Sequence, residues 1–243
     1  YSIIIPTRNE EEGIAKVLVS IPEKIKKESE IIVADNSNDS TPKIAEALGA
    51  RIIKLKREGK GYAMRIAAER AKGEILIFLD GDGTDNPKYI PILLRKLEKS
   101  NLVLGCRRSD KIDGIQLKVL HSFYSVLIKR IFLPIGINLT DPLAGFRAIR
   151  KSDWKKLNLK SNGFEIEAEM NIKAKELGFK IDEVLIKADK RSGGILKSKL
   201  LTNPKEWIAI MNVIIKYVKE KKLKDFYKKL KEEILESFKK LNV

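Results

Sequence analysis

The stretch EILIFLDGDGTDNP, residues 74 to 87, decides the fold of this chain. It begins as an almost uninterrupted apolar run, which is typical of a strand buried on both faces of a parallel sheet. It then ends in two aspartates, Asp80 and Asp82, with only Gly81 between them. Two carboxylates placed there repel each other and lose solvation, which favours a site for a hard divalent cation. An ordinary turn remains the alternative on this stretch alone, because Asp, Gly, Asn and Pro are all turn residues.

Apolar runs alternate with helix-like stretches on both sides of this segment. The predicted strands of the first part are Ser2 to Pro6, Glu30 to Ala34, Arg51 to Leu55 and Glu74 to Leu79, and the predicted helices are Glu10 to Ser20, Thr41 to Leu48 and Gly61 to Lys72. Further strands are predicted at Leu102 to Cys106, Ala144 to Ile149 and Ile181 to Ile186, with a helix at Glu165 to Leu177. This alternation predicts an α/β fold with a mostly parallel, Rossmann-like central sheet, flanking helices, and ligands at the strand ends.

Composition bounds the class of protein. The 243 residues, 43% hydrophobic and 34% charged, suit one large globular domain with appended helices. Cys106 is the only cysteine, which excludes an intrachain disulfide and a cysteine-rich metal site. The formal charge of +16 indicates a polyanionic partner, either nucleic acid, anionic lipid or a phosphorylated substrate, although a solvated lysine surface would give the same value. No run of about 18 uncharged apolar residues exists, so we expect no transmembrane segment.

Two amphipathic stretches leave their function open. Leu117 to Leu133 has a broad apolar face, and Lys221 to Leu241 repeats apolar residues at helical spacing opposite many lysines. Either stretch fits a helix lying on an anionic membrane surface. Packing against the rest of the protein is the alternative for both.

Polar clusters follow three of the predicted strands and meet at one edge of the predicted sheet. They read IPTRNEEEG after the first strand, ADNSNDST after the second and LDGDG after the fourth. In this order they resemble glycosyltransferase family 2, whose fold is GT-A. The resemblance covers roughly residues 1–200, so we expect the catalytic domain there and a C-terminal amphipathic helical extension at 201–243.

The resemblance implies a role for each cluster. Asp80 would lie near the ribose of a nucleotide sugar, and Asp82 would hold Mg²⁺ or Mn²⁺ on its diphosphate, with both counted as metal-site and catalytic residues. Lys60, in a Gly-Lys-Gly turn before a helix, would meet the diphosphate, although a flexible turn is the alternative. Ala34 departs from the family pattern, which has an aspartate there. The remaining donor-binding residues implied are Pro6, Thr7, Asn9, Glu10, Asp35 and Gly81.

Later motifs resemble polyprenyl-phosphate glycosyltransferases, the subgroup that contains dolichol-phosphate mannose synthases. They are TDPLAGFRAIRK from Thr140, Gly163-Phe164-Glu165, and RSGGILKSKL from Arg191. Thr84 stands where those synthases commonly have glutamine. A lipid phosphate is already anionic, so it needs cations to orient it more than a base to deprotonate it. The candidate cations are Arg107, Arg108, Arg147, Arg191 and one of Lys197 and Lys199, and for each a surface salt bridge is the alternative.

The function that the resemblance implies is inverting transfer of a hexose from GDP-mannose, UDP-glucose or UDP-N-acetylglucosamine to dolichyl or another polyprenyl phosphate. The expected location is cytoplasmic, peripherally on the cytoplasmic face of a membrane. A soluble phosphorylated metabolite or a sugar hydroxyl is the alternative acceptor, and for a hydroxyl Asp141 would be the candidate base unless it only holds a loop or an arginine. A basic nucleic-acid-binding protein is the rival class, disfavoured by 7% aromatic content and the lack of a recognition motif, so no nucleic acid is expected.

Overall fold

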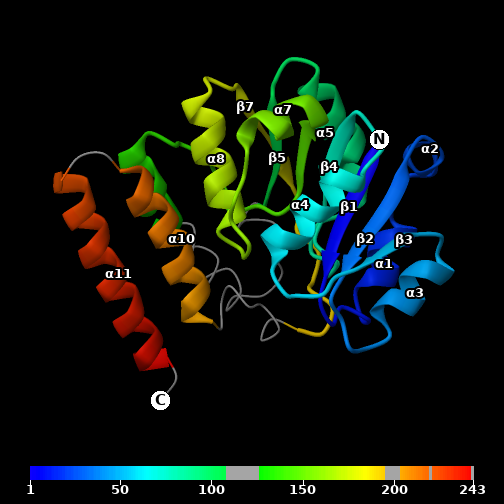
Figure 1. Ribbon diagram of the computed structural model, residues 1–243, viewed down its shortest axis with the longest axis horizontal. Helices are drawn as coiled ribbons and strands as arrows, with labels where there is room; N and C mark the ends of the chain where they lie inside the picture. Colours follow the sequence, from blue (N-terminus) through cyan, green and yellow to red (C-terminus); the bar gives the residue numbers. More distant parts are fainter. Residues whose placement is uncertain (108–125, 195–202, 219–220, 242–243) are drawn as a thin grey trace.

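A seven-stranded sheet forms the centre of the molecule, in the strand order β3-β2-β1-β4-β6-β5-β7 (Figure 1). The computed structural model describes residues 1–107, 126–194, 203–218 and 221–241. The strands are β1 (Ser2–Thr7), β2 (Glu30–Asp35), β3 (Arg51–Lys54), β4 (Ile75–Phe78), β5 (Leu102–Arg107), β6 (Arg147–Arg150) and β7 (Ile181–Ile186). Each coincides with a predicted apolar run to within a few residues.

The sheet is mostly parallel, as predicted. β1 pairs in parallel with both β2 and β4, and β5 pairs in parallel with β7. β6 is the antiparallel exception, because its first residue, Arg147, pairs with Phe78 and Leu104, so β6 runs back between β4 and β5. The strand order turns around at β1, with β2 and β3 on one side and β4 on the other. A crevice at such a switch point is where open α/β sheets bind ligands.

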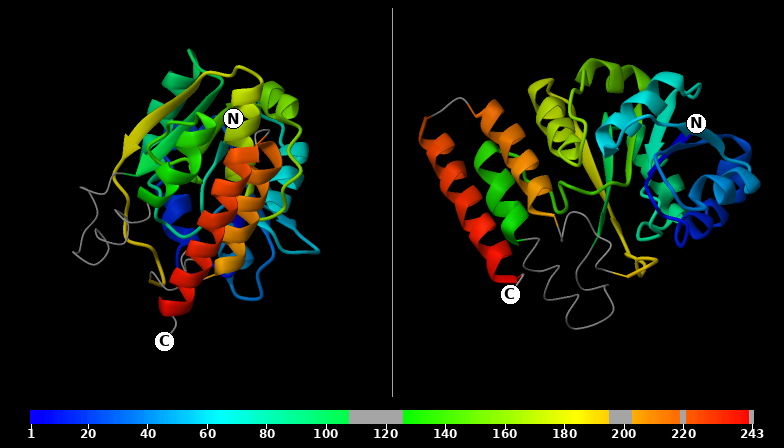
Figure 2. Two further views of the ribbon diagram at one scale, coloured as in Figure 1. Left: turned by 90° about the vertical axis from the view of Figure 1, so that its left-hand side faces the viewer. Right: turned by 60° about the horizontal axis from the view of Figure 1, so that its bottom comes forward.

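Helices cover both faces of the sheet (Figures 1 and 2). The helices are α1 (Ile14–Val19), α2 (Glu23–Lys27), α3 (Thr41–Ala47), α4 (Lys60–Arg70), α5 (Ile90–Leu97), α7 (Lys151–Leu157), α8 (Ile166–Glu176), α10 (Pro204–Tyr217) and α11 (Lys221–Leu241), with 3-10 turns η1 (Pro87–Tyr89) and η3 (Leu133–Ile135). One hydrophobic core joins the sheet to α4, α7 and α8, and a second joins it to α1, α2, α3 and α5. Gly49, at φ +86°, follows α3 in the left-handed conformation that is common just beyond a helix C-terminus.

A third core lies beside the sheet, where α10, α11 and helical residues 126–132 come together. Tyr227, Leu230 and Ile234 of α11 are buried in it, as are Ile128 and Ile131. Between residues 223 and 236 the apolar stripe of α11 therefore packs inside the protein, which is one of the two alternatives that the sequence leaves open. Of Leu117 to Leu133, Ile128, Ile131 and Phe132 pack in this core, whereas Val126 and Leu133 stay exposed, and residues 117–125 lie outside the described residues.

The outward face of α11 is of mixed charge between residues 223 and 236. Its exposed charged side chains are Lys224, Lys228 and Lys229 against Asp225, Glu232, Glu233 and Glu236. This part of the helix is therefore less basic on its exposed side than its lysine content suggests. Among the described residues, no helix is both long enough and apolar enough to cross a membrane. The division into residues 1–200 and 201–243 stays a prediction, since α10 packs directly on α8.

Candidate active site

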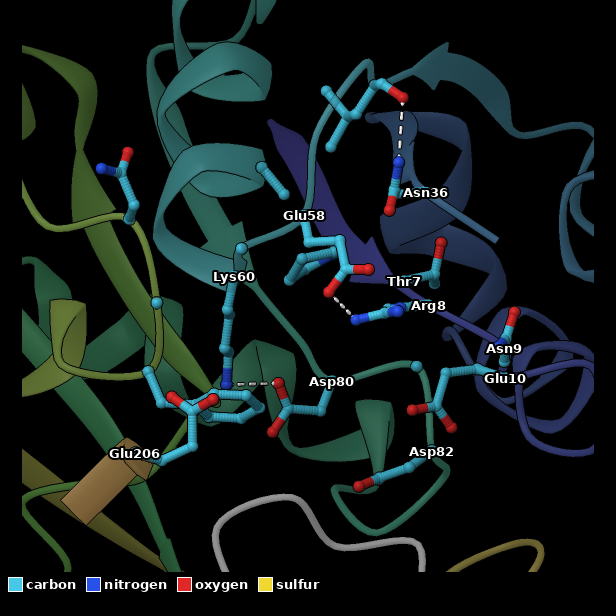
Figure 3. A pocket seen from close by; sticks show the side chains of 18 of the residues that line it. Thr7, Arg8, Asn9, Glu10, Asn36, Glu58, Lys60, Asp80, Asp82 and Glu206 are labelled. Carbon is cyan, nitrogen blue, oxygen red and sulfur yellow. Dashed lines mark hydrogen bonds and ion pairs between the residues drawn. The ribbon is translucent and has the colours of Figure 1, made fainter. Parts of the chain in front are cut away.

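A pocket of about 900 Å³ opens over the carboxyl ends of β1, β2, β3 and β4 (Figure 3). It lies at the switch point of the sheet, where the predicted polar clusters meet. Its walls are formed by Pro6, Thr7, Arg8, Asn9, Glu10, Asn36, Leu55, Glu58, Gly59, Lys60, Ala63, Asp80, Gly81, Asp82, Asn162, Gly163, Phe164, Arg191, Asn203 and Glu206. Nine predicted site residues are among them, from Pro6 to Arg191.

The loop after β1 is locked onto the loop after β2. Asn9 adopts a left-handed backbone, with φ 57°, and its Oδ1 accepts from the Asn38 amide at 3.0 Å. The Asn9 amide in turn donates to Ser37 Oγ at 2.8 Å, and the Glu10 amide donates to Thr41 Oγ1 at 2.9 Å. Short side chains that bond nearby main-chain groups rigidify turns in this way. The pocket therefore has a preformed wall over β1 and β2.

Asp35 lies under this wall and does not line the pocket. Its side chain is 0% exposed and accepts from Thr7 Oγ1 at 2.7 Å and from Ser37 Oγ at 2.6 Å. The next residue, Asn36, does reach the pocket, and its Nδ2 donates to the main-chain oxygen of Leu55 at 3.0 Å. The nucleoside contact that we predicted for Asp35 does not fit a fully enclosed carboxylate. Its position supports Thr7 instead.

Asp80 and Asp82 lie at the other end of the pocket, each beside a cation. Asp80 Oδ1 is 2.6 Å from Lys60 Nζ, and Asp82 Oδ2 is 2.6 Å from Arg191 Nη1. The Thr84 amide donates to Asp82 Oδ1 at 2.8 Å, so this residue binds the acidic loop through its main chain. Burial favours a protonated Asp80, but the charge and hydrogen bond of Lys60 outweigh it and lower the Asp80 pKa. Asp80 is therefore ionised at neutral pH.

The ammonium of Lys60 joins two carboxylates. Besides Asp80 it contacts Glu167 Oε1 of α8 at 2.6 Å, and Glu167 is 2% exposed. Burial by itself would lower the pKa of Lys60, but the two negative charges raise it, so the ammonium stays protonated. Lys60 lines the pocket, and its ammonium is held mainly by the ion pairs with Asp80 and Glu167. It therefore positions the acidic pair as well as facing any phosphate.

Asp85 is a buried acid three residues beyond the acidic pair. Its side chain is 2% exposed, and neither carboxyl oxygen has a hydrogen-bond partner in the described structure. Burial raises its pKa to about 7, with Arg107 opposing the shift and the charges of Asp80, Asp82 and Asp141 adding to it. Asp85 is thus partly protonated near neutral pH.

Arg107 and Asp141 pair with each other beside this cluster, outside the walls of the pocket. Arg107 Nε lies 3.0 Å from Asp141 Oδ2, and Asp141 is 3% exposed. Of the two functions that the sequence allows for Asp141, the structure brings it into position for holding an arginine. Its predicted function as a base would require it to become accessible.

Arg147 lies in the interior of the protein. Its side chain is 0% exposed, and it donates to the main-chain oxygens of Pro142 and Ala144 at 2.7 Å each and to Asn171 Oδ1 at 2.8 Å. A guanidinium enclosed by these acceptors does not reach a substrate, so the catalytic and phosphate-binding role predicted for Arg147 does not fit its position. It instead ties the loop before β6 to α8. Arg108, Lys197 and Lys199 lie outside the described residues.

The donor atoms at Asp80 and Asp82 suit Mg²⁺ or Mn²⁺. Carboxylate oxygens are hard ligands, and Mg²⁺ is usually bound by one or two carboxylates together with substrate phosphates and water. Within the described ranges, no group of three or more His, Cys, Asp or Glu side chains forms a cluster that would hold a metal by itself. Gly145 leaves room for the acid, since a Cβ there would lie 2.5 Å from Asp80 Oδ2. The pair therefore fits a metal that is bound jointly with a diphosphate.

Sequence reasoning missed several residues at the site: Arg8, Asn36, Glu58, Asp85, Glu167 and Glu206. The sequence held a signal for Glu167: it lies four residues before Asn171 and seven before Ala174, so the three residues share one face of the predicted helix. In the structure that face is buried, and its two polar side chains belong to a buried polar network. Glu58 carried no such signal, since a charged residue beside a glycine turn is usually solvated.

Comparison with known proteins agrees with this geometry. The family model "Glycosyl transferase family 2" matches residues 2–157. The low-salt glycan biosynthesis hexosyltransferase Agl6 of Haloferax volcanii is 30% identical over 213 residues, which cover 85% of this chain and 51% of that protein, so the chain spans about half of its length. The undecaprenyl-phosphate mannosyltransferase of Micrococcus luteus is 29% identical over 227 residues, covering 84% of this chain and 92% of that protein.

A solved structure shares the fold. Glucosyl-3-phosphoglycerate synthase from Mycobacterium tuberculosis, crystallised with Mn²⁺, UDP-glucose and phosphoglyceric acid, superposes with a TM-score of 0.68 at 25% identity, covering 88% of this chain and 79% of that one. The GT-A fold predicted from the strand-end motifs is therefore confirmed. With a family match over most of the chain and the acidic pair at the switch point, this chain belongs to glycosyl transferase family 2.

Proposed function

We propose that this protein is an inverting hexosyltransferase that moves a sugar from a nucleotide donor to dolichyl or another polyprenyl phosphate. The observation that carries the proposal is a single pocket in which Asp80 and Asp82 lie between a preformed wall over β1 and β2 and the cation Arg191. A nucleoside diphosphate has a matching layout, with an uncharged base at one end and charged phosphates at the other. The printed names of the Haloferax and Micrococcus relatives support the same class of reaction.

The residues divide the reaction between them. Pro6, Thr7 and Asn9 line the end of the pocket that would hold the nucleoside. Asp82, with Asp80 nearer the ribose, would hold Mg²⁺ or Mn²⁺ against the diphosphate. When bound, the metal neutralises the negative charge that develops on the leaving nucleoside diphosphate.

Arg191 is the cation best placed for the acceptor. It lines the pocket, and its contact with Asp82 would be shared or exchanged when phosphates arrive. A lipid phosphate attacks as an anion, so no residue has to take a proton from it. The absence of an assigned protein nucleophile accords with single displacement and inversion at the sugar carbon.

A soluble phosphorylated acceptor is the second candidate. It is favoured by the structural likeness to glucosyl-3-phosphoglycerate synthase, which was crystallised with phosphoglyceric acid. Both candidates need a cation for the acceptor phosphate, and they differ in what surrounds the rest of the acceptor. A sugar hydroxyl would in addition need a base, and Asp141 is paired with Arg107 instead.

Transfer assays separate these candidates. Purified protein is incubated with Mn²⁺ or Mg²⁺, each radiolabelled nucleotide sugar in turn, and either a short polyprenyl phosphate or phosphoglyceric acid. We expect label in the organic phase with the lipid acceptor, loss of that label in Asp82→Asn, and no loss in the matched surface variant Asp225→Asn. If product forms only with the soluble acceptor, the second candidate is correct and the first is wrong. If no combination of nucleotide sugar and acceptor gives product, both are refuted.

We also propose that the protein works peripherally at the cytoplasmic face of a membrane. Val126 and Leu133, at the two ends of the third core's short helix, remain 68% and 56% exposed. Val126→Glu combined with Leu133→Glu should reduce sedimentation with anionic liposomes, because exposed apolar side chains at a membrane contact lose their burial when charged. Val19→Glu, which charges a residue 66% exposed on α1, is the control. Equal sedimentation of all three proteins would refute this surface.

A further inference from the structure

The pocket carries an ion pair between Arg8 and Glu58. Arg8 directly follows β1, and Glu58 belongs to the segment between β3 and α4. Figure 3 shows the two side chains pointing toward one another within the pocket, between Asn36 on one side and Asp80 and Asp82 on the other. Their side chains are 38% and 55% exposed, so a ligand in the pocket can reach both.

The direction of a bound donor follows from the order of the strands. The diphosphate belongs beside Asp80 and Asp82, after β4 at one side of the switch point. The nucleoside then extends across the ends of β1 and β2 toward β3, where Thr7, Asn36 and Leu55 form the wall. Arg8 and Glu58 lie along that path, between Asn36 and the acidic pair, where they can meet the nucleoside (Figure 3).

The ion pair still has hydrogen-bonding capacity toward a ligand. It joins Arg8 Nη1 to Glu58 Oε2, which uses one of the five guanidinium donors, and each carboxylate oxygen accepts more than one bond. Along the edge that faces the ligand, the pair offers an N–H donor of Arg8 and then the two carboxylate oxygens of Glu58 as acceptors. The Watson–Crick edge of guanine is its complement: the O6 acceptor, then the N1–H and N2–H donors.

Uracil has a different edge. Its single donor, N3–H, lies between two carbonyl oxygens. A carboxylate that accepts from N3–H with one oxygen turns its other oxygen toward a carbonyl oxygen, and two acceptors then face each other without a proton. Unpaired polar groups of this kind are how a binding site rejects the wrong ligand.

We propose that Arg8 and Glu58 read the base of the nucleotide donor and select guanine over uracil. This inference rests on the proposed function, because it assumes a nucleotide sugar in the pocket, and it narrows the donor to a guanosine diphosphate sugar. The two residues act on specificity and take no part in the transfer step.

Glu58→Gln is the informative variant, because an amide carries one acceptor and one donor where the carboxylate has two acceptors. Beside Arg8 the edge then offers a donor, an acceptor and a donor, which matches uracil. The substitution is safe for folding, since an ion pair this exposed contributes little to stability. Glu46→Gln, on the exposed side of α3 and outside the pocket, makes the same change of charge as a control.

The test is calorimetric binding of GDP, IDP and UDP to each protein with Mn²⁺ present. In the unaltered protein we expect GDP to bind roughly 5- to 150-fold more tightly than UDP, equivalent to about 1–3 kcal/mol for one bidentate base contact. IDP, which lacks the 2-amino group, should fall between them. Glu58→Gln should abolish or reverse the GDP preference, and Glu46→Gln should keep it.

The outcomes separate the inference from the proposed function. UDP binding as tightly as GDP or more tightly, or an unchanged GDP-to-UDP ratio in Glu58→Gln, would overturn the selection of guanine and leave a nucleotide-sugar transferase standing. Binding of none of the nucleotides would overturn the inference together with the proposed function.

Discussion

Replacing Asp85 by asparagine should change the unfolding free energy of the metal-free protein more favourably at pH 8 than at pH 4. The side chain is 2% exposed without hydrogen-bond partners in the described structure, and burial raises its pKa from 3.8 to about 7. Below pH 4 the acid is protonated in the folded and unfolded states alike, so it costs nothing electrostatically. Between about pH 4 and pH 7 the unfolded state releases this proton while the folded state keeps it, so stability falls as the pH rises.

The magnitude follows from the two pKa values. The interval from 3.8 to about 7, at about 1.36 kcal/mol per unit, amounts to roughly 4 kcal/mol of lost stability once the pH exceeds both values. Asparagine is neutral at every pH, so it removes this loss. Its amide has its own desolvation cost, but that cost is the same at both pH values and cancels in their difference.

The assay is urea unfolding of both proteins at pH 4 and pH 8 with EDTA present, because a bound cation would favour the ionised acid. The effect of Asp85→Asn on the unfolding free energy should be more favourable at pH 8 by up to about 4 kcal/mol. Asp225→Asn, at an exposed position of α11, should give differences within about 0.5 kcal/mol at both values. An effect of Asp85→Asn that is equal at the two pH values would show that the buried acid carries no such penalty.

Three further predictions address the support of the site and the third core. Lys60→Met should lower the unfolding free energy by about 3–5 kcal/mol in urea, because it leaves Glu167, which is 2% exposed, as a buried charge without its cation; a loss below 1 kcal/mol would contradict this. Tyr227→Phe should cost about 1–3 kcal/mol in thermal unfolding, because its hydroxyl donates to a buried main-chain oxygen at 2.6 Å; an unchanged melting temperature would argue against α11 packing there. Gly145→Ala should abolish metal-dependent transfer without changing the circular dichroism spectrum, because its Cβ would displace the Asp80 carboxylate; full activity would mean that Asp80 moves without consequence.

The sequence predicted the sheet and the meeting of the polar clusters well, because both depend on local patterns. A continuous apolar run followed by Asp-Gly-Asp shows where β4 ends, and the segments after β1 and β2 have the same form. Parallel strands then bring these ends to one edge whatever the connecting helices do. Bounds differed by a few residues, as for the first predicted helix, of which only Ile14–Val19 is regular.

The partners of the charged residues were decided by the tertiary structure alone. Nothing near Lys60 in the chain indicates that α8 brings Glu167 to it from more than a hundred residues away, or that Arg147 is enclosed by carbonyls and Asn171. A motif that contains an arginine reads the same whether that side chain faces a phosphate or lies buried in the interior. Apolar periodicity and turn residues therefore determine the fold and the edge where the site lies. The packing of distant elements determines which charges meet, because the energy of an ion pair depends on burial and distance that no single stretch of sequence contains.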